Sequence, residues 1–94
     1  MRAEKLLALW HSYRQKMQSA RSSASLLTLI DELIKNPAIT YGQAARVLDV
    51  THRAAVMNIR KLIDAGILER VSERQRNQLF IAREIIAALE SGFA

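Results

Sequence analysis

The 94-residue chain contains no cysteine, which excludes a disulfide framework, a thiolate metal site and a cysteine nucleophile. Its three glycines, Gly42, Gly66 and Gly92, are isolated, so the sequence has no glycine-rich loop to hold a phosphate. The two histidines, His11 and His52, lie far apart with no further ligand types clustered beside them. These absences predict a chain with no catalytic residue, no metal and no cofactor.

Long apolar runs are also missing. No run approaches the roughly 18 residues of a membrane span, and the first residues lead into no signal-type core. We therefore expect no membrane contact, and the lack of cysteine fits a cytoplasmic location. Half of the residues are apolar, which is enough for the core of one small domain.

The net charge of +5 is distributed unevenly. Residues 44–83 carry eight basic and four acidic side chains, a net of +4, whereas residues 84–94 carry a net of −2. Basic residues without acidic neighbours cluster at 51–61, and Arg74 and Arg76 lie two apart further along. Such clusters attract phosphate, although an ordinary solvated basic surface shows the same pattern.

Apolar residues at steps of three and four predict helices at 2–20 and 23–35. The second is apolar around much of its girth, so we expect it at the centre of the core and ending before Pro37. Trp10 and Tyr13 of the first helix are expected to pack on the second. The alternative is that they bind a partner, and a long terminal helix is also a natural dimer contact.

Two short helices follow. After a connection at 38–39, Thr40 is a good N-cap for a helix that reaches about Leu48. Asp49 and Val50 form a tight turn, in which Asp49 takes a position that often needs a left-handed backbone. Thr51 caps the next helix, and Gly66 is placed to end that helix.

The last part of the chain predicts two strands, at 67–71 and 78–81, joined by a basic loop at 72–77. A helix-turn-helix followed by such a hairpin is the layout of a winged helix. The expected fold is therefore mainly α with a small two-stranded wing (α+β), preceded by an added N-terminal helix. We divide the chain into a linking or dimerisation helix at 1–21 and a winged-helix domain at 22–94.

The helix after Thr51 is the candidate recognition helix, because Ala55, Ile59 and Leu62 form an inward face. The opposite face can enter a major groove, where arginine pairs with guanine and apolar side chains contact thymine methyl groups. The expected DNA-binding residues are Thr51, His52, Arg53, Met57, Arg60 and Lys61 of the helix, with Arg74, Arg76 and Asn77 of the hairpin. The alternatives are an amphipathic helix with a charged outer face and an ordinary exposed hairpin.

The run from Ala20 to Leu89 resembles the C-terminal winged-helix domain of bacterial Fic-family proteins. The resemblance is carried by ARSSASLLTLIDELIKNPAIT, AARVLDVTHRAAVMNIRKLIDAGIL and ERQRNQLFIAREII. Segment 4–19 resembles the helix that leaves the catalytic domain in those proteins. In two places the chain departs from the family pattern. Asp49 replaces the usual glycine of the turn, and Asn58 replaces a small apolar residue beside the core face.

The resemblance implies a piece of a longer protein whose Fic domain transfers AMP, or a related group, to a hydroxyl of a target protein. The catalytic signature of that domain, a histidine followed by a GNGR-type loop, is absent here, so only an accessory role carries over. We expect a non-catalytic, homodimeric module that binds duplex DNA and regulates the parent protein. The alternatives are a protein-interaction module that recruits the target of the parent enzyme, and a stand-alone small repressor.

Overall fold

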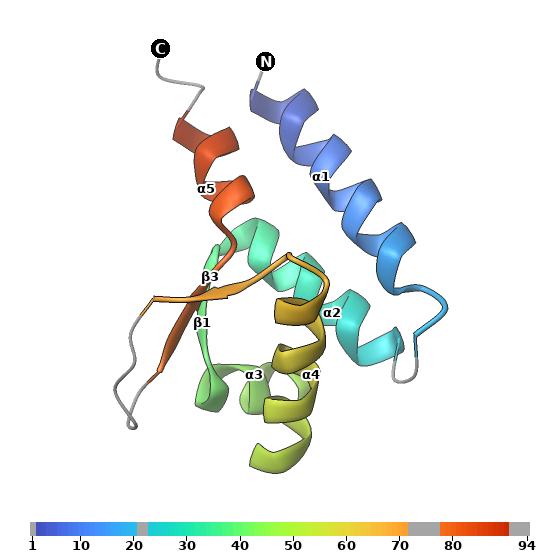
Figure 1. The fold of residues 1–94 in the computed structure, drawn as a ribbon, viewed down its shortest axis with the longest axis vertical. Helices are drawn as coiled ribbons and strands as arrows, with labels where there is room; N and C mark the ends of the chain where they lie inside the picture. Colours follow the sequence, from blue (N-terminus) through green and yellow to red (C-terminus); the bar gives the residue numbers. More distant parts are fainter. Residues whose placement is uncertain (1, 21–22, 72–77, 91–94) are drawn as a thin grey trace.

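The computed structural model describes residues 2–20, 23–71 and 78–90, and it contains helices around a small sheet (Figure 1). The elements in chain order are α1 (Arg2–Met17), α2 (Ser23–Lys35), β1 (Ala38–Thr40), α3 (Tyr41–Leu48), α4 (His52–Asp64), β2 (Glu69–Arg70), β3 (Leu79–Ile81) and α5 (Arg83–Glu90). This is the predicted winged helix-turn-helix with an added N-terminal helix. No helix in the described ranges combines the length and the apolar character that crossing a membrane requires.

Helix α2 is the central element of the core, as predicted. Its residues Leu26, Leu29, Ile30 and Leu33 are all essentially inaccessible to solvent. It contacts α1, α3 and α4. The helix ends at Lys35, because the residue before Pro37 is pushed out of the α conformation.

Helix α1 lies across α2 and α5 (Figure 1). Trp10 donates a hydrogen bond from Nε1 to Asp31 of α2 (2.6 Å), and Arg14 forms an ion pair with the same carboxylate (3.1 Å). The predicted packing of the first helix on the second is therefore confirmed. The predicted extent of 2–20 is too long, because the helix ends at Met17 and Ala20 closes a turn by donating its N–H to the Met17 carbonyl.

The sheet has three strands in the order β1-β3-β2, and all its pairs are antiparallel. The predicted two-stranded wing thus lacks one strand. Where the sequence predicts only a connection at 38–39, the structure forms β1. Ile39 stands opposite Phe80 in the register, and both side chains are buried. Strand β1 joins the wing to the helical core, so the hairpin is anchored rather than projecting alone.

The first wing strand begins later than predicted. Gly66 has a φ of 79°, a conformation that an L side chain strains to adopt, and it ends α4 as predicted. Its N–H bonds the Ile63 carbonyl (2.9 Å), and the Ile67 N–H bonds the Leu62 carbonyl (2.9 Å), which is the Schellman pattern. The N–H groups of Ile67 and Leu68 both donate to the Leu62 carbonyl of α4, and both side chains are buried in the core. The strand is therefore limited to Glu69–Arg70.

Tyr13 connects α1 to α5. Its ring is 1% exposed, and its hydroxyl donates a hydrogen bond to Glu84 Oε1 (2.9 Å). Burial raises the pKa of the Tyr13 hydroxyl well above its ordinary value near 10, and the hydrogen bond and charge of Glu84 raise it further.

Replacing Tyr13 by phenylalanine is expected to lower the free energy of unfolding by about 1 kcal/mol at neutral pH. Since the pKa is raised in the folded state, the contribution of Tyr13 is complete below pH 10 and is lost as the pH rises above that value. Urea titrations of both proteins at pH 7 and at higher pH measure this effect. The difference in unfolding free energy between the natural chain and the Tyr13→Phe protein should become smaller above pH 10. A difference that grows there would contradict the proposed role of the Tyr13 hydroxyl.

Candidate nucleic-acid interface

Helix α4 begins at a well-formed cap. Thr51 has extended backbone angles (φ −67°, ψ 159°), and its hydroxyl accepts a hydrogen bond from the Ala54 N–H (3.2 Å). Residues 51–53 are exposed, so the N-terminus of α4 is accessible to solvent. The helix dipole favours an anion at this position. The predicted cap is confirmed.

The inner face of α4 is also as predicted. Ala55, Ile59 and Leu62 are fully buried, and they fix the rotation of the helix about its axis. The opposite face consequently points into solvent. The predicted contact residues His52, Arg53, Met57 and Arg60 are all exposed. Arg53, Met57 and Arg60 lie on this outer face, whereas His52 lies on the side of α4 that meets Tyr41 of α3.

The arginines of this face have no partners within the part of the chain that the structure describes. Neither Arg53 nor Arg60 makes an ion pair or a side-chain hydrogen bond there, and α1 does not cover them. Lys61, by contrast, is half-buried and takes part in an interaction within the protein. Two of the three basic residues of α4 are therefore available to an external anion.

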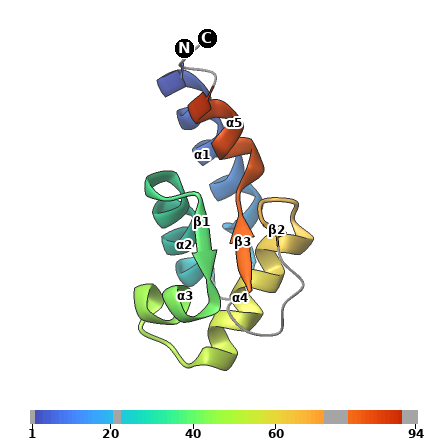
Figure 2. The same cartoon turned by 90° about the vertical axis from the view of Figure 1, so that its left-hand side faces the viewer.

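Helix α3 meets α4 at a tight turn that Asp49 makes possible. Asp49 adopts the left-handed conformation (φ 54°, ψ 52°), as the sequence predicts. Its N–H donates to the Arg46 carbonyl (3.3 Å), and the Val50 N–H donates to the Ala45 carbonyl (3.1 Å). These two carbonyl groups at the end of α3 therefore have hydrogen-bond partners. The turn places α3 beside α4, and both lie at the lower end of the molecule (Figure 2).

A glycine at this turn is expected to stabilise the fold, because the left-handed conformation costs an L-residue about 1–2 kcal/mol and Asp only part of that. The Asp49→Gly protein should gain about 0.5–1 kcal/mol in unfolding free energy, measured by urea titration. Asp49→Asn removes the charge but keeps a residue that tolerates the conformation, so it is the matched control. Equal stability of the glycine variant and the natural chain would show that the turn is unstrained.

A polar recess lies beside the start of α3. Its lining comes from the end of β1, from α3, from the start of α4 and from the residue before β3, and its volume is about 530 Å³. The residues that line it are Thr40, Tyr41, Gly42, Gln43, Arg46, His52 and Gln78. The His52 ring meets the Tyr41 ring edge-on at 5.6 Å between centroids, and Tyr41 in turn packs on Phe80 at 4.8 Å. Helix α4 is thus connected to β3 through two aromatic contacts.

Arg46 is a residue that the sequence reasoning missed. It is exposed on α3, it borders the recess, and no side-chain partner is found for it among the described residues. The first helix of a helix-turn-helix crosses the DNA backbone, so a basic residue there is well placed to contact a phosphate. Its position in the last turn of α3 was readable from the sequence, but only the structure shows that it points away from the core.

Asn58 is the polar residue that the sequence placed near the core. It is 5% exposed, and its Nδ2 donates to the Ala54 carbonyl of the same helix (3.0 Å). Its Oδ1 has no hydrogen-bond partner among the described residues. The predicted inward polar group is confirmed, and it belongs to the core rather than to the exposed face.

The wing carries part of the predicted site. The Val71 N–H bonds the Leu79 carbonyl (2.9 Å), which continues the β2–β3 pairing beyond the strand, and the Arg70 guanidinium lies 5.9 Å from the centre of the Phe80 ring. The predicted contacts Arg74, Arg76 and Asn77 lie outside the described residues.

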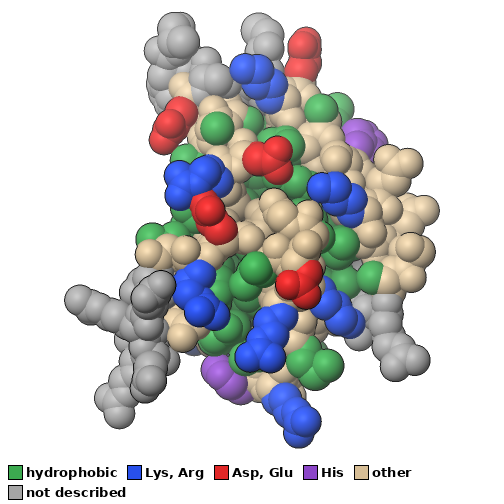
Figure 3. Space-filling view, viewed as in Figure 1, with side chains coloured by type: hydrophobic (Ala, Val, Ile, Leu, Met, Phe, Trp, Pro, Cys, Tyr) green, Lys and Arg blue, Asp and Glu red, His purple; other side chains and the backbone are tan. Residues whose placement is uncertain are grey.

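The distribution of charge agrees with this geometry. Figure 3 shows Lys and Arg side chains over both halves of the molecule, with a group at the lower end, where α4 lies, that has apolar side chains among it. Asp and Glu side chains lie mainly over the upper part. Among the residues described, no group of three or more His, Asp or Glu side chains is arranged to hold a metal ion. The arrangement suits the binding of an extended polyanion.

Comparison with solved structures identifies the fold. A MarR family transcriptional regulator from Silicibacter pomeroyi is similar over 92% of this chain, with a TM-score of 0.60 and 19% sequence identity. The chain spans 63% of that protein's length. No protein-family model matches the sequence, and no curated protein matches it. The likeness establishes a winged-helix fold.

Proposed function

We propose that the chain is a non-catalytic module that binds duplex DNA through α4. The observation that carries this proposal is the exposed face of α4, where Arg53 and Arg60 have no side-chain partner among the described residues while the opposite face is buried in the core. A helix of this size fits the major groove, and its N-terminal half usually reaches the base edges. The similarity to a transcriptional regulator supports the proposal.

The roles of the basic residues follow from their positions. Arg53 lies in the first turn of α4 and would contact a base edge, with guanine as the favoured partner. Thr51, at the start of the same helix, would donate to a phosphate, as would Arg46 from α3. His52 and Arg60 would border the groove, with Lys61, Arg74, Arg76 and Asn77 as further contacts predicted from the sequence.

A salt series with a randomised pool of duplex DNA tests the proposal. Binding should weaken steeply with salt and should enrich a particular sequence. The Arg46→Ala protein should lose about one unit of slope in log Kd against log salt, whereas Arg53→Ala should weaken binding to the selected site by about 1–3 kcal/mol and relax its specificity.

Lys35→Ala is the matched control for this experiment, because Lys35 is exposed at the end of α2 and lies at the end of β1 remote from α3. Its salt slope and its selected sequence should equal those of the natural chain. Salt-dependent binding without any enriched sequence would leave only a basic surface. Absence of binding at low salt would reject the proposal.

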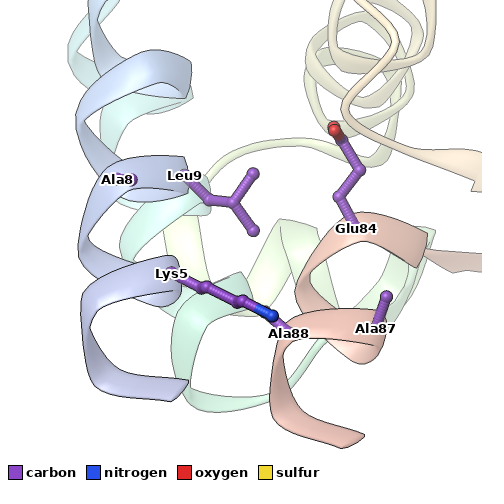
Figure 4. A pocket seen from close by; sticks show the side chains of 6 residues that line it. All are labelled: Lys5, Ala8, Leu9, Glu84, Ala87 and Ala88. Atoms are coloured by element: carbon purple, nitrogen blue, oxygen red, sulfur yellow. The ribbon is translucent and has the colours of Figure 1, made fainter. Parts of the chain in front are cut away.

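A second surface supports the proposed homodimer. Helices α1 and α5 border an open, mainly apolar cleft of about 450 Å³ in the half of the molecule opposite α3 (Figures 1 and 4). Its lining residues are Lys5, Ala8 and Leu9 of α1 with Glu84, Ala87 and Ala88 of α5. We propose that a second copy packs here, which would leave both recognition helices free.

Charged side chains in this cleft are expected to separate the copies. A chain with Ala8→Glu and Ala87→Glu should sediment as a monomer at concentrations where the natural chain sediments as a dimer. The His11→Glu protein is the control, because His11 is exposed on α1 but does not line the cleft. A natural chain that remains monomeric at high concentration would refute the dimer while leaving DNA binding by α4 intact.

The place of this module within a Fic-family protein is a further proposal. It rests on the sequence resemblance alone, since no family model matches the chain. Reading the gene upstream of residue 1 tests it. An open reading frame that encodes a histidine and a GNGR-type loop would support the Fic parent, and an in-frame stop codon immediately upstream would contradict it. In that parent the same winged helix would serve either DNA binding or recruitment of the target protein.

A further inference from the structure

The exposed face of α4 has an apolar centre between two basic side chains. Arg53, Met57 and Arg60 follow one another at steps of four and three, so they form one stripe along the helix. This stripe lies opposite the buried Ala55 and Ile59. Met57 is 53% exposed, so this large apolar side chain contributes little to the core.

The major groove contains one apolar group that such a side chain can recognise. Each base pair presents donors and acceptors there, and only thymine adds a methyl group at its edge. Methionine is unbranched and flexible, so it adapts its shape to a small apolar surface. The neighbouring arginines suit guanine instead. A methionine between two arginines therefore suits a DNA site that contains both thymine and guanine. Contacts with the phosphate backbone alone would use the arginines but not the methionine.

We propose that Met57 is a specificity-determining residue that contacts the 5-methyl group of a thymine, close to the guanine contacted by Arg53. This inference rests on the proposed binding of α4 in a major groove. Four helical residues span about 6 Å along the axis, and successive base pairs are about 3.4 Å apart. The thymine therefore lies about two base pairs from that guanine.

The geometry of the helix also limits which part of it reads the bases. Asp64 follows Met57 and Arg60 on the same side of α4, and its carboxylate is exposed. A negative charge at that end is repelled by phosphates, so the N-terminal half of α4 must enter the groove more deeply than the C-terminal end. Met57 is in the middle of α4, where the N-terminal half ends.

Deoxyuridine provides a direct test, because it lacks only the methyl group of thymine and keeps the same hydrogen-bonding edge. The duplex selected from the randomised pool is synthesised with each thymine replaced in turn by deoxyuridine, and Kd is measured for each duplex. At one position the replacement should weaken binding of the natural chain about fourfold, the effect of one buried methyl group.

Two variants separate a direct contact from an indirect effect. The Met57→Ala protein should bind the thymine and deoxyuridine duplexes equally. The Leu7→Ala protein is the matched control, because Leu7 is 55% exposed on α1, at the other end of the fold, and it should retain the fourfold difference. Circular dichroism verifies that both variants are folded.

The failures of the two proposals are distinguishable. Binding that is insensitive to every deoxyuridine, or a penalty that persists in Met57→Ala, would overturn the role of Met57 while leaving DNA binding by α4 in place. Absence of binding to any duplex would overturn both.

Discussion

A chain with Arg53→Glu and Arg60→Glu is expected to lose at least 100-fold in affinity for its selected duplex. Each lost arginine contact with a base or phosphate costs about 1–3 kcal/mol, and each introduced carboxylate adds repulsion from the phosphates. The loss should originate in binding alone. Both side chains are exposed, and a glutamate in the first turn of α4 is favoured by the helix dipole.

The control for this double variant must carry the same net charge. Each reversal lowers the charge by two, so both Arg53→Glu/Arg60→Glu and Lys16→Glu/Lys35→Glu have +1 in place of +5. Lys16 is exposed near the end of α1 and outside the cleft, and Lys35 ends α2, so neither lies on the face of α4. The control should keep its affinity within a few-fold at physiological salt. Equal losses in both proteins would show that only the total charge matters.

The Phe80→Ala protein is expected to lose about 3–5 kcal/mol of unfolding free energy, the largest effect of a single core substitution in this fold. Phe80 is fully buried, it stands opposite Ile39 of β1, and its ring packs on Tyr41 of α3. Its removal leaves a cavity where the sheet meets the helix-turn-helix. A domain of this length has roughly 5–14 kcal/mol in total, so the variant is expected to be partly unfolded at 37 °C.

Urea titration measures this loss, with Leu79→Ala as the control on the same strand. Leu79 is only half-buried, so its truncation should cost clearly less. A stabilising concentration of osmolyte should restore folding of the Phe80→Ala protein, and with it most of the DNA affinity. A loss below about 1 kcal/mol for Phe80→Ala would contradict the packing described for β1 and β3.

Helix α4 was predictable from the sequence because its determinants are local. A cap at Thr51, an inward face at steps of three and four, and a terminating Gly66 all lie within one short segment, and each is decided by neighbouring residues. The left-handed Asp49 was predictable for the same reason. The rotation of α4, and with it the exposed position of Met57, follows from the same spacing.

Strand β1 was not predictable from such local patterns. Strand β1 has three residues, too few to show an alternating pattern, and its partner β3 is far away in sequence. Only the assembled core brings Ile39 opposite Phe80. The bond from Tyr13 to Glu84 likewise joins the two ends of the described chain, and the exposure of Arg46 depends on how α3 packs. These features depend on tertiary contacts that no local pattern encodes.

The central claim, that the exposed face of α4 contacts DNA, is tested most directly by NMR. The chain is small enough for complete assignment of the backbone amides in a ¹⁵N-labelled sample, titrated with the selected duplex. The proposed binding mode predicts that the shift changes concentrate at 51–60 and around Arg46 of α3, while the amides of α1 and α5 that line the apolar cleft remain nearly unchanged. Changes confined to α1 and α5, with α4 unaffected, would contradict it.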